Sequence, residues 1–68
     1  MDQEEINNNF VYHAPKPNQI EIYSELRSRG RVLATYLNNM CPDSREKSLA
    51  LTKLEECIMW ANASIARN

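Results

Sequence analysis

The chain has 68 residues, a length that leaves room for only one small domain. It carries eight basic and nine acidic side chains, which give a net charge of −1. Such a balance does not suit a protein that coats phosphates, so neither DNA nor RNA is an expected partner. No apolar run approaches the roughly 18 to 20 residues of a membrane span, and the acidic N-terminus is unlike a signal peptide. We therefore expect a cytosolic protein without membrane contact.

The first segment, residues 1–9, is polar and contains three consecutive asparagines. Because it has little to bury, we expect a flexible or loosely tethered end, with order beginning at Phe10 and a single domain over residues 10–68. Residues 10–17 contain two prolines, which disfavour a helix and favour an extended arm.

Helical spacing begins at Asn18, which suits an N-cap, and predicts a helix over about residues 18–39. Gly30 falls inside this pattern, either as a tolerated defect costing about 1 kcal/mol or as a point where another backbone approaches closely. The apolar seam at intervals of three and four consists of Tyr23, Leu26, Gly30, Leu33, Leu37 and Met40.

A second helix is predicted over about residues 44–67, because Pro42 cannot continue the first one. Ser44 or Asp43 suits its N-cap, and Glu46 could complete a capping box with Asp43. Its seam consists of Leu51, Leu54, Ile58, Ala61 and Ile65. The short connection makes the helices antiparallel neighbours, so the predicted fold is all-α, a two-helix hairpin with an N-terminal arm.

A chain of this length buries on folding only about 60% of the surface that its unfolded form exposes. We therefore expect an additional source of stability, namely a disulfide, a metal ion or a partner subunit. Cys57 would lie on the second helix, roughly 20 Å along its axis from Cys41, which is too far for a disulfide. His13 has no partner at metal-ligand spacing. We therefore expect no metal and no cofactor, and a helical homo-oligomer. The apolar side chains expected to face other subunits are Ile20, Ile22, Tyr36, Leu49, Cys57, Met59 and Trp60.

Two groups of polar side chains suit anion binding. Arg45, Ser48 and Thr52 form one stripe, which is either a solvated face or, with the first-turn Lys47, an anion site at a helix N-terminus. Arg27 and Arg31 are like charges four residues apart, so an anion between them would relieve their repulsion. A solvated face remains the alternative for this pair.

On the arm, Tyr12 offers a flat face on which a base could stack, and His13 offers a hydrogen-bond donor. Catalytic groups are poorly arranged, because Glu55 and Glu56 are adjacent on a helix and diverge, and nothing pairs with His13. These residues suit holding a phosphate and a base. We therefore expect a binding protein and not an enzyme.

The arm and the second helix together resemble the phage anti-CBASS sponge family of cyclic-nucleotide-binding proteins. The residues that carry the resemblance are the arm motif Phe10-x-Tyr12-His13-x-Pro15, the run of residues 42–56, Met59-Trp60-Ala61-Asn62-Ala63 and Ile65-Ala66-Arg67. The resemblance implies a helical hairpin that assembles into hexamers in the cytosol of an infected host cell. It also implies sequestration of cyclic dinucleotides, such as cyclic GMP-AMP, and cyclic trinucleotides without cleavage, which would keep CBASS effectors silent.

The resemblance also implies two sites. A cyclic dinucleotide would meet Tyr12 by stacking and Arg27 by its phosphate, with His13, Lys16 and Arg31 nearby. A cyclic trinucleotide would bind near the start of the second helix, at Arg45, Ser48, Leu49 and Thr52. The competing hypothesis is an adaptor or antitoxin-like module that docks a protein partner through its apolar surface.

Overall fold

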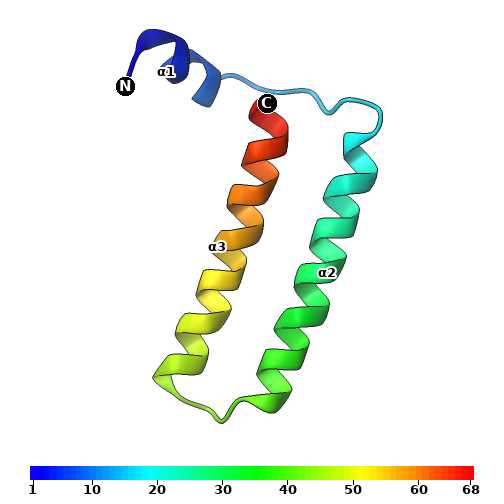
Figure 1. The fold of residues 1–68 in the computed structure, drawn as a ribbon, viewed down its shortest axis with the longest axis vertical. Coiled ribbons are helices and arrows are strands. Elements are labelled where there is room, and N and C mark those ends of the chain that lie inside the picture. The colour runs from blue at the N-terminus through cyan, green and yellow to red at the C-terminus, as the bar shows by residue number, and fades with distance from the viewer.

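The computed structural model describes residues 1–68 and contains three helices and no strand: α1 (Gln3–Asn9), α2 (Gln19–Met40) and α3 (Arg45–Arg67). The two long helices run antiparallel, and a short turn joins them at one end of the molecule (Figure 1). At the other end, the arm passes the C-terminus of α3 on its way from α1 to α2. The predicted all-α hairpin is confirmed.

The turn between the long helices follows from local sequence. The Cys41 backbone N–H donates to the Leu37 carbonyl and closes α2, and Pro42 follows. Ser44 is the N-cap of α3, because its hydroxyl accepts from the Lys47 backbone N–H at 3.1 Å. The capping box between Asp43 and Glu46 is not formed. Asp43 instead accepts a hydrogen bond from the Lys47 ammonium at 2.8 Å.

The start of α2 differs from the predicted cap. Asn18 occupies the N-cap position, but its backbone is helical (φ −85°, ψ −10°) and its side chain makes no capping hydrogen bond. A capping side chain usually requires an extended backbone at this position. Gln19 Oε1 instead accepts from the backbone N–H of Lys16, which precedes the helix, at 2.9 Å.

The contact face of α3 is the predicted seam, all of whose members are partly buried. On α2 the prediction was wrong in two places, because Leu33 is 47% exposed and Met40 is 64% exposed. Ala34 replaces Leu33 on the contact face. Gly30 and Ala34 lie four residues apart on one side of the helix, and their small size lets α3 pack directly over them. The close neighbour of Gly30 is the Ile58 side chain and not a backbone.

Residues 3–9 form a helix, so the expectation that order begins only at Phe10 is wrong. Asp2 is its N-cap and accepts from the Glu5 backbone N–H at 2.7 Å, and acidic residues in the first turn favour the helix dipole. Flexibility of this segment stays a prediction.

Side chains from outside α3 satisfy carbonyl groups in its last turn, which have no partners within the helix. Asn8 Nδ2 donates to the Arg67 carbonyl at 3.3 Å, and Gln19 Nε2 donates to the Ile65 carbonyl at 3.1 Å. These bonds tie both ends of the arm to the same helix terminus. The arm is thereby held across the open end of the hairpin.

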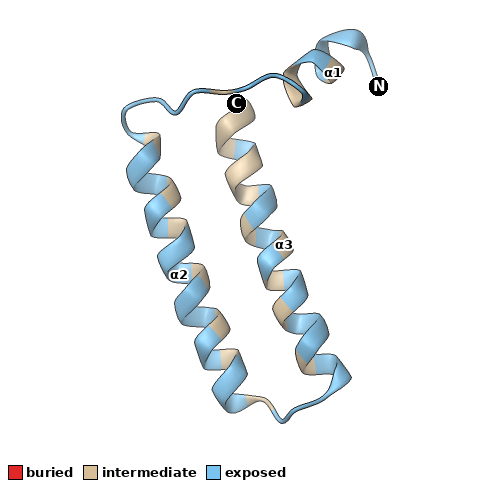
Figure 2. Ribbon diagram, turned by 180° about the vertical axis from the view of Figure 1, so that it is seen from behind, coloured by how far each residue is buried: buried red, intermediate tan, exposed pale blue.

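The hairpin has no buried residue, as Figure 2 shows by colour. It measures 44 × 29 × 12 Å, so its smallest dimension is about one helix diameter, roughly 10 to 12 Å. Its radius of gyration of 15.2 Å exceeds the value of about 11 Å expected for a compact chain of this length. The molecule is a single layer of helices without an enclosed core.

The side chains predicted to lie off the seams are exposed, including Tyr36, Met59 and Trp60. Cys41 and Cys57 are free thiols, as predicted. None of the three helices combines the length and the apolar character needed to cross a bilayer.

Candidate functional site

The open end of the hairpin contains a cavity of about 490 Å³, which we call the end pocket. Four segments contribute to it: α1 with Asn9, the arm with Tyr12 and His13, α2 with Tyr23 and Arg27, and α3 with Asn62 and Arg67. The volume lies within the range of about 300 to 1,000 Å³ that is usual for small-molecule sites. The structure thus brings together three of the sequence-predicted residues, Tyr12, His13 and Arg27.

The arm presents its two rings differently. Tyr12 is 84% exposed, so the face of its ring is open for stacking. His13 is partly buried, and its Nε2 donates to the Asn8 carbonyl at 2.7 Å. A neutral histidine that donates through Nε2 keeps Nδ1 as an acceptor. The donor predicted for a ligand is therefore used within the protein, where it fixes the path of the arm.

The cations of the chain fall into two groups. Three form ion pairs: Arg29 with Glu25 at 2.7 Å, Lys47 with Asp43 at 2.8 Å and Lys53 with Glu56 at 3.3 Å. The cations without an ion pair are Lys16, Arg27, Arg31, Arg45 and Arg67. All but Arg67 are residues that the sequence assigns to a ligand site.

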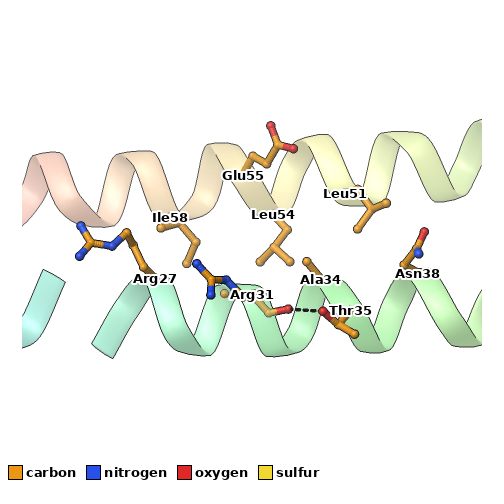
Figure 3. A pocket seen from close by; sticks show the side chains of 10 residues that line it. Arg27, Arg31, Ala34, Thr35, Asn38, Leu51, Leu54, Glu55 and Ile58 are labelled. Carbon is orange, nitrogen blue, oxygen red and sulfur yellow. Dashed lines mark hydrogen bonds between the residues drawn. The ribbon is translucent and has the colours of Figure 1, made fainter. Parts of the chain in front are cut away.

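A second cavity, the helix groove, lies between α2 and α3 and has a volume of about 590 Å³. The floor of the helix groove is apolar. Arg31 lines the helix groove rather than the end pocket (Figure 3). Arg27 lines both cavities and so stands at their boundary. Lys16 lines neither cavity. Its backbone N–H is bonded to Gln19, and its ammonium has no protein partner.

The predicted stripe of Arg45, Ser48 and Thr52, together with Leu49, lies exposed on the first half of α3. None of these residues lines a described cavity. Lys47 was expected to add a second cation there, but its side chain is only 11% exposed and is paired with Asp43. A single chain therefore presents this stripe as an open surface.

The Arg45 stripe lies at the start of α3 and the end pocket is lined by residues near its end, and Figure 1 shows that these are opposite ends of the hairpin. Arg45 and Arg67 are the first and last residues of α3, about 33 Å apart at 1.5 Å per residue. One small ligand cannot contact both regions of the same chain. The structure thus separates the two predicted sites.

Sequence reasoning assigned seven of the ten residues that line the end pocket to no ligand site, among them Tyr23, Asn62 and Arg67. Tyr23 was assigned to the seam alone, and Arg67 to a helix end. A signal existed for Arg67, because an arm that precedes the first helix of a hairpin must lie near the end of the second. No signal within α3 distinguishes Asn62 from a solvated asparagine.

The end pocket combines a stacking face, two unpaired guanidinium groups and an amide, which is a set of groups that suits a flat ring bearing a phosphate. No group of three or more histidine, cysteine or acidic side chains is placed to hold a metal ion. The pocket residues are thus suited to recognising an anion with an aromatic part.

Comparison with known proteins gives a single family. No curated protein and no solved structure matches the chain. The family model described as the Acb2/Tad1 hairpin domain matches residues 2–66, which include α1, α2 and all of α3 except its last residue, Arg67. The chain therefore belongs to the Acb2/Tad1 hairpin family, the anti-CBASS sponge family that its sequence resembles.

Proposed function

We propose that this protein binds and sequesters cyclic dinucleotides and cyclic trinucleotides, such as cyclic GMP-AMP, and thereby blocks activation of CBASS effectors during phage infection. The observation that carries the proposal is the meeting of Tyr12, His13 and Arg27 in the end pocket. Tyr12 and His13 come from the arm and Arg27 comes from α2, and together they supply a stacking face and a cation without an ion pair. Membership of the sponge family supports the same function.

In this proposal the base stacks on Tyr12, and a phosphate meets Arg27. A guanidinium forms two parallel hydrogen bonds to a phosphate, which makes arginine a strong and directional partner. Arg31 lies one helical turn beyond Arg27 and lines the helix groove. It would meet the second phosphate of a cyclic dinucleotide that extends from the end pocket toward the groove.

The proposed active form is a homo-oligomer, most simply a hexamer. The solvent-accessible surface of one chain is 5,695 Å², about 1,300 Å² more than the roughly 4,400 Å² expected for a compact monomer of this mass. Exposed apolar side chains on both long helices suit burial against copies of the chain. Convergence of several chains would also enclose the Arg45 stripe and complete the proposed cyclic trinucleotide site.

The proposed action is binding without cleavage, in the cytosol of the infected cell. Phosphodiester hydrolysis calls for metal ligands or a paired acid and base. Glu56 is paired with Lys53, and the only protein partner of the His13 ring is the Asn8 carbonyl. Sequestration needs only a long-lived complex, which the stacking and cationic groups of the end pocket would supply.

Titration calorimetry with cyclic GMP-AMP and with a cyclic trinucleotide tests the proposal. Both should bind, whereas the linear dinucleotide should bind more weakly because it loses more conformational freedom on binding. Nucleotide released from the complex by heating should co-elute with the untreated standard. Failure to bind any cyclic nucleotide would favour the protein-docking alternative, and accumulation of linear products would reveal an enzyme.

A further inference from the structure

One polar atom of Asn62, a residue that lines the end pocket, has no hydrogen-bond partner. The Oδ1 atom of Asn62 has less than 1 Å² of exposed surface and accepts no hydrogen bond. It is the only enclosed side-chain oxygen or nitrogen of the chain in this situation. Buried acceptors are almost always satisfied in folded proteins, so an exception calls for a physical explanation.

The surroundings of Asn62 suit a flat ring. Ala63 and Ala66, its neighbours on α3, also line the end pocket, and both have only a methyl side chain. The same pocket is also lined by the aromatic rings of Tyr12 and Tyr23. An aromatic ring lying in this pocket could present its edge to Asn62.

No hydrogen bond holds the Asn62 amide in its orientation. The Nδ2 group has no protein acceptor and is not enclosed as Oδ1 is. The torsion between Cβ and the amide carbon is broad, so a half-turn exchanges the positions of oxygen and nitrogen at low cost. Asn62 is therefore able to present either a donor or an acceptor to the pocket.

We infer that Asn62 is the residue of the end pocket that reads the edge of the bound nucleobase. An asparagine amide matches a base edge because both carry a donor and an acceptor side by side. This inference rests on the proposed function and adds to it the residue that recognises the base. Tyr12 and Arg27 would contact any base and any phosphate alike, whereas the Asn62 amide would add a hydrogen bond to the edge of the base.

The inference explains why the chain keeps a polar group at this place. Replacing an unsatisfied buried amide by an apolar group of the same shape is often neutral or stabilising. A residue that reduces stability without a partner in the free protein is expected where function requires it. Asn62 should therefore show opposite effects on stability and on binding.

Asn62→Leu tests this trade-off, since leucine has nearly the same shape and no polar atom. Cyclic di-AMP should bind about tenfold more weakly, a typical value for losing one specific base contact. The melting temperature should be unchanged or higher. Asn39→Leu is the matched control, because Asn39 is exposed on α2 and lines no described cavity. It should leave the affinity unchanged.

Two further measurements keep the result unambiguous. In the wild-type protein, the side-chain NH₂ signals of Asn62 in a nitrogen-15 spectrum should shift when cyclic di-AMP is added. Asn62→Ala, which removes the amide without adding bulk, should also weaken binding about tenfold.

Unchanged affinity of the Asn62 variants, or NH₂ signals that do not move, would overturn the inference and leave the proposed function intact. A variant that loses the wild-type oligomer would show that a neighbouring chain satisfies the amide, which also overturns it. Absence of cyclic di-AMP binding by the wild-type chain would overturn the base-reading role, and it would overturn the proposed function only if other cyclic nucleotides also fail.

Discussion

Gly30 and Ile58 set how closely the two long helices approach. A Cβ atom built on Gly30 would lie 3.0 Å from Cγ1 and 3.2 Å from Cδ1 of Ile58. The first distance is well inside an optimal contact of about 3.5 to 4.0 Å between carbon atoms. Cγ1 is bonded directly to the Ile58 Cβ, so it cannot move away as the tip of a flexible side chain could. Glycine therefore favours close packing here, and its backbone conformation is an ordinary one.

Gly30→Ala should reduce the free energy of unfolding by about 1 kcal/mol. Alanine gains about 1 kcal/mol in helix propensity, but overpacking against Ile58 costs about 1 to 3 kcal/mol. In an Ile58→Ala background the obstructing atoms are absent, so the same substitution should stabilise by about 1 kcal/mol. Urea unfolding at one fixed protein concentration measures both effects. An effect of the same sign in both backgrounds would show that the contact does not limit helix approach.

Tyr12→Ala should weaken cyclic dinucleotide binding and leave cyclic trinucleotide binding nearly unchanged. Loss of a stacking face costs about 1 to 3 kcal/mol, which is roughly five- to 150-fold in affinity. Arg45→Ala should do the reverse, with a larger loss, because symmetry repeats this cation around a shared site. Titration calorimetry with one ligand of each class measures both variants.

Both substitutions should leave the oligomer intact, because Tyr12 and Arg45 lie on neither seam and are not among the apolar side chains expected to face other subunits. Size-exclusion chromatography of the two variants provides this control. If each substitution weakened both ligands equally, the two-site arrangement would be wrong.

The wild-type protein should be an obligate oligomer, since a single layer without any buried residue lacks a core to stabilise it. Light scattering on a size-exclusion peak should give a mass of several chains, with a hexamer as the proposed state. Trp60→Glu should dissociate it and lower the melting temperature, because a charge on an interface side chain has no partner. A folded wild-type monomer at micromolar concentration would contradict this prediction.

Asn8→Ala should loosen the arm and weaken cyclic dinucleotide binding about two- to tenfold, the equivalent of one ordinary hydrogen bond. The substitution removes the bond to the Arg67 carbonyl but keeps the Asn8 carbonyl that holds His13. Hydrogen exchange of residues 10–14 should become faster. Asn7→Ala is the control, because the Asn7 side chain bonds only to Gln3. Equal effects of both variants would mean that α1 acts only through its helical stability.

Asp43 should stabilise the start of α3 only above acidic pH. The hydrogen bond and charge of the Lys47 ammonium lower the pKa of Asp43 below its ordinary value of 3.8. A carboxyl group whose pKa is lower in the folded than in the unfolded protein stabilises the fold at pH values above its unfolded pKa. This stabilisation is lost as the pH falls through the folded pKa. Asp43→Asn should therefore be less stable than wild type at about pH 6 and equal to it at about pH 2. Urea unfolding at both pH values checks this, and a constant difference would exclude the ion pair as its cause.

The sequence by itself determined the hairpin. Helical periodicity, the Ser44 cap and the proline at position 42 act over a few residues, so they define two long helices and a turn whatever the rest of the chain does. The face of α3 was likewise readable from its spacing. The cap and acidic first turn of α1 were equally local signals, although the polar composition of the segment concealed them.

Only the tertiary structure decided which side chains meet across the hairpin. The rotation of α2 depends on how closely α3 packs over Gly30 and Ala34, so spacing along one helix could not reveal that Leu33 turns outward. The end pocket likewise exists only once α3 returns beside the arm and brings Asn62 and Arg67 to Tyr12. Contacts between distant segments depend on packing in three dimensions, and a periodic pattern along one helix carries no information about its partner's position.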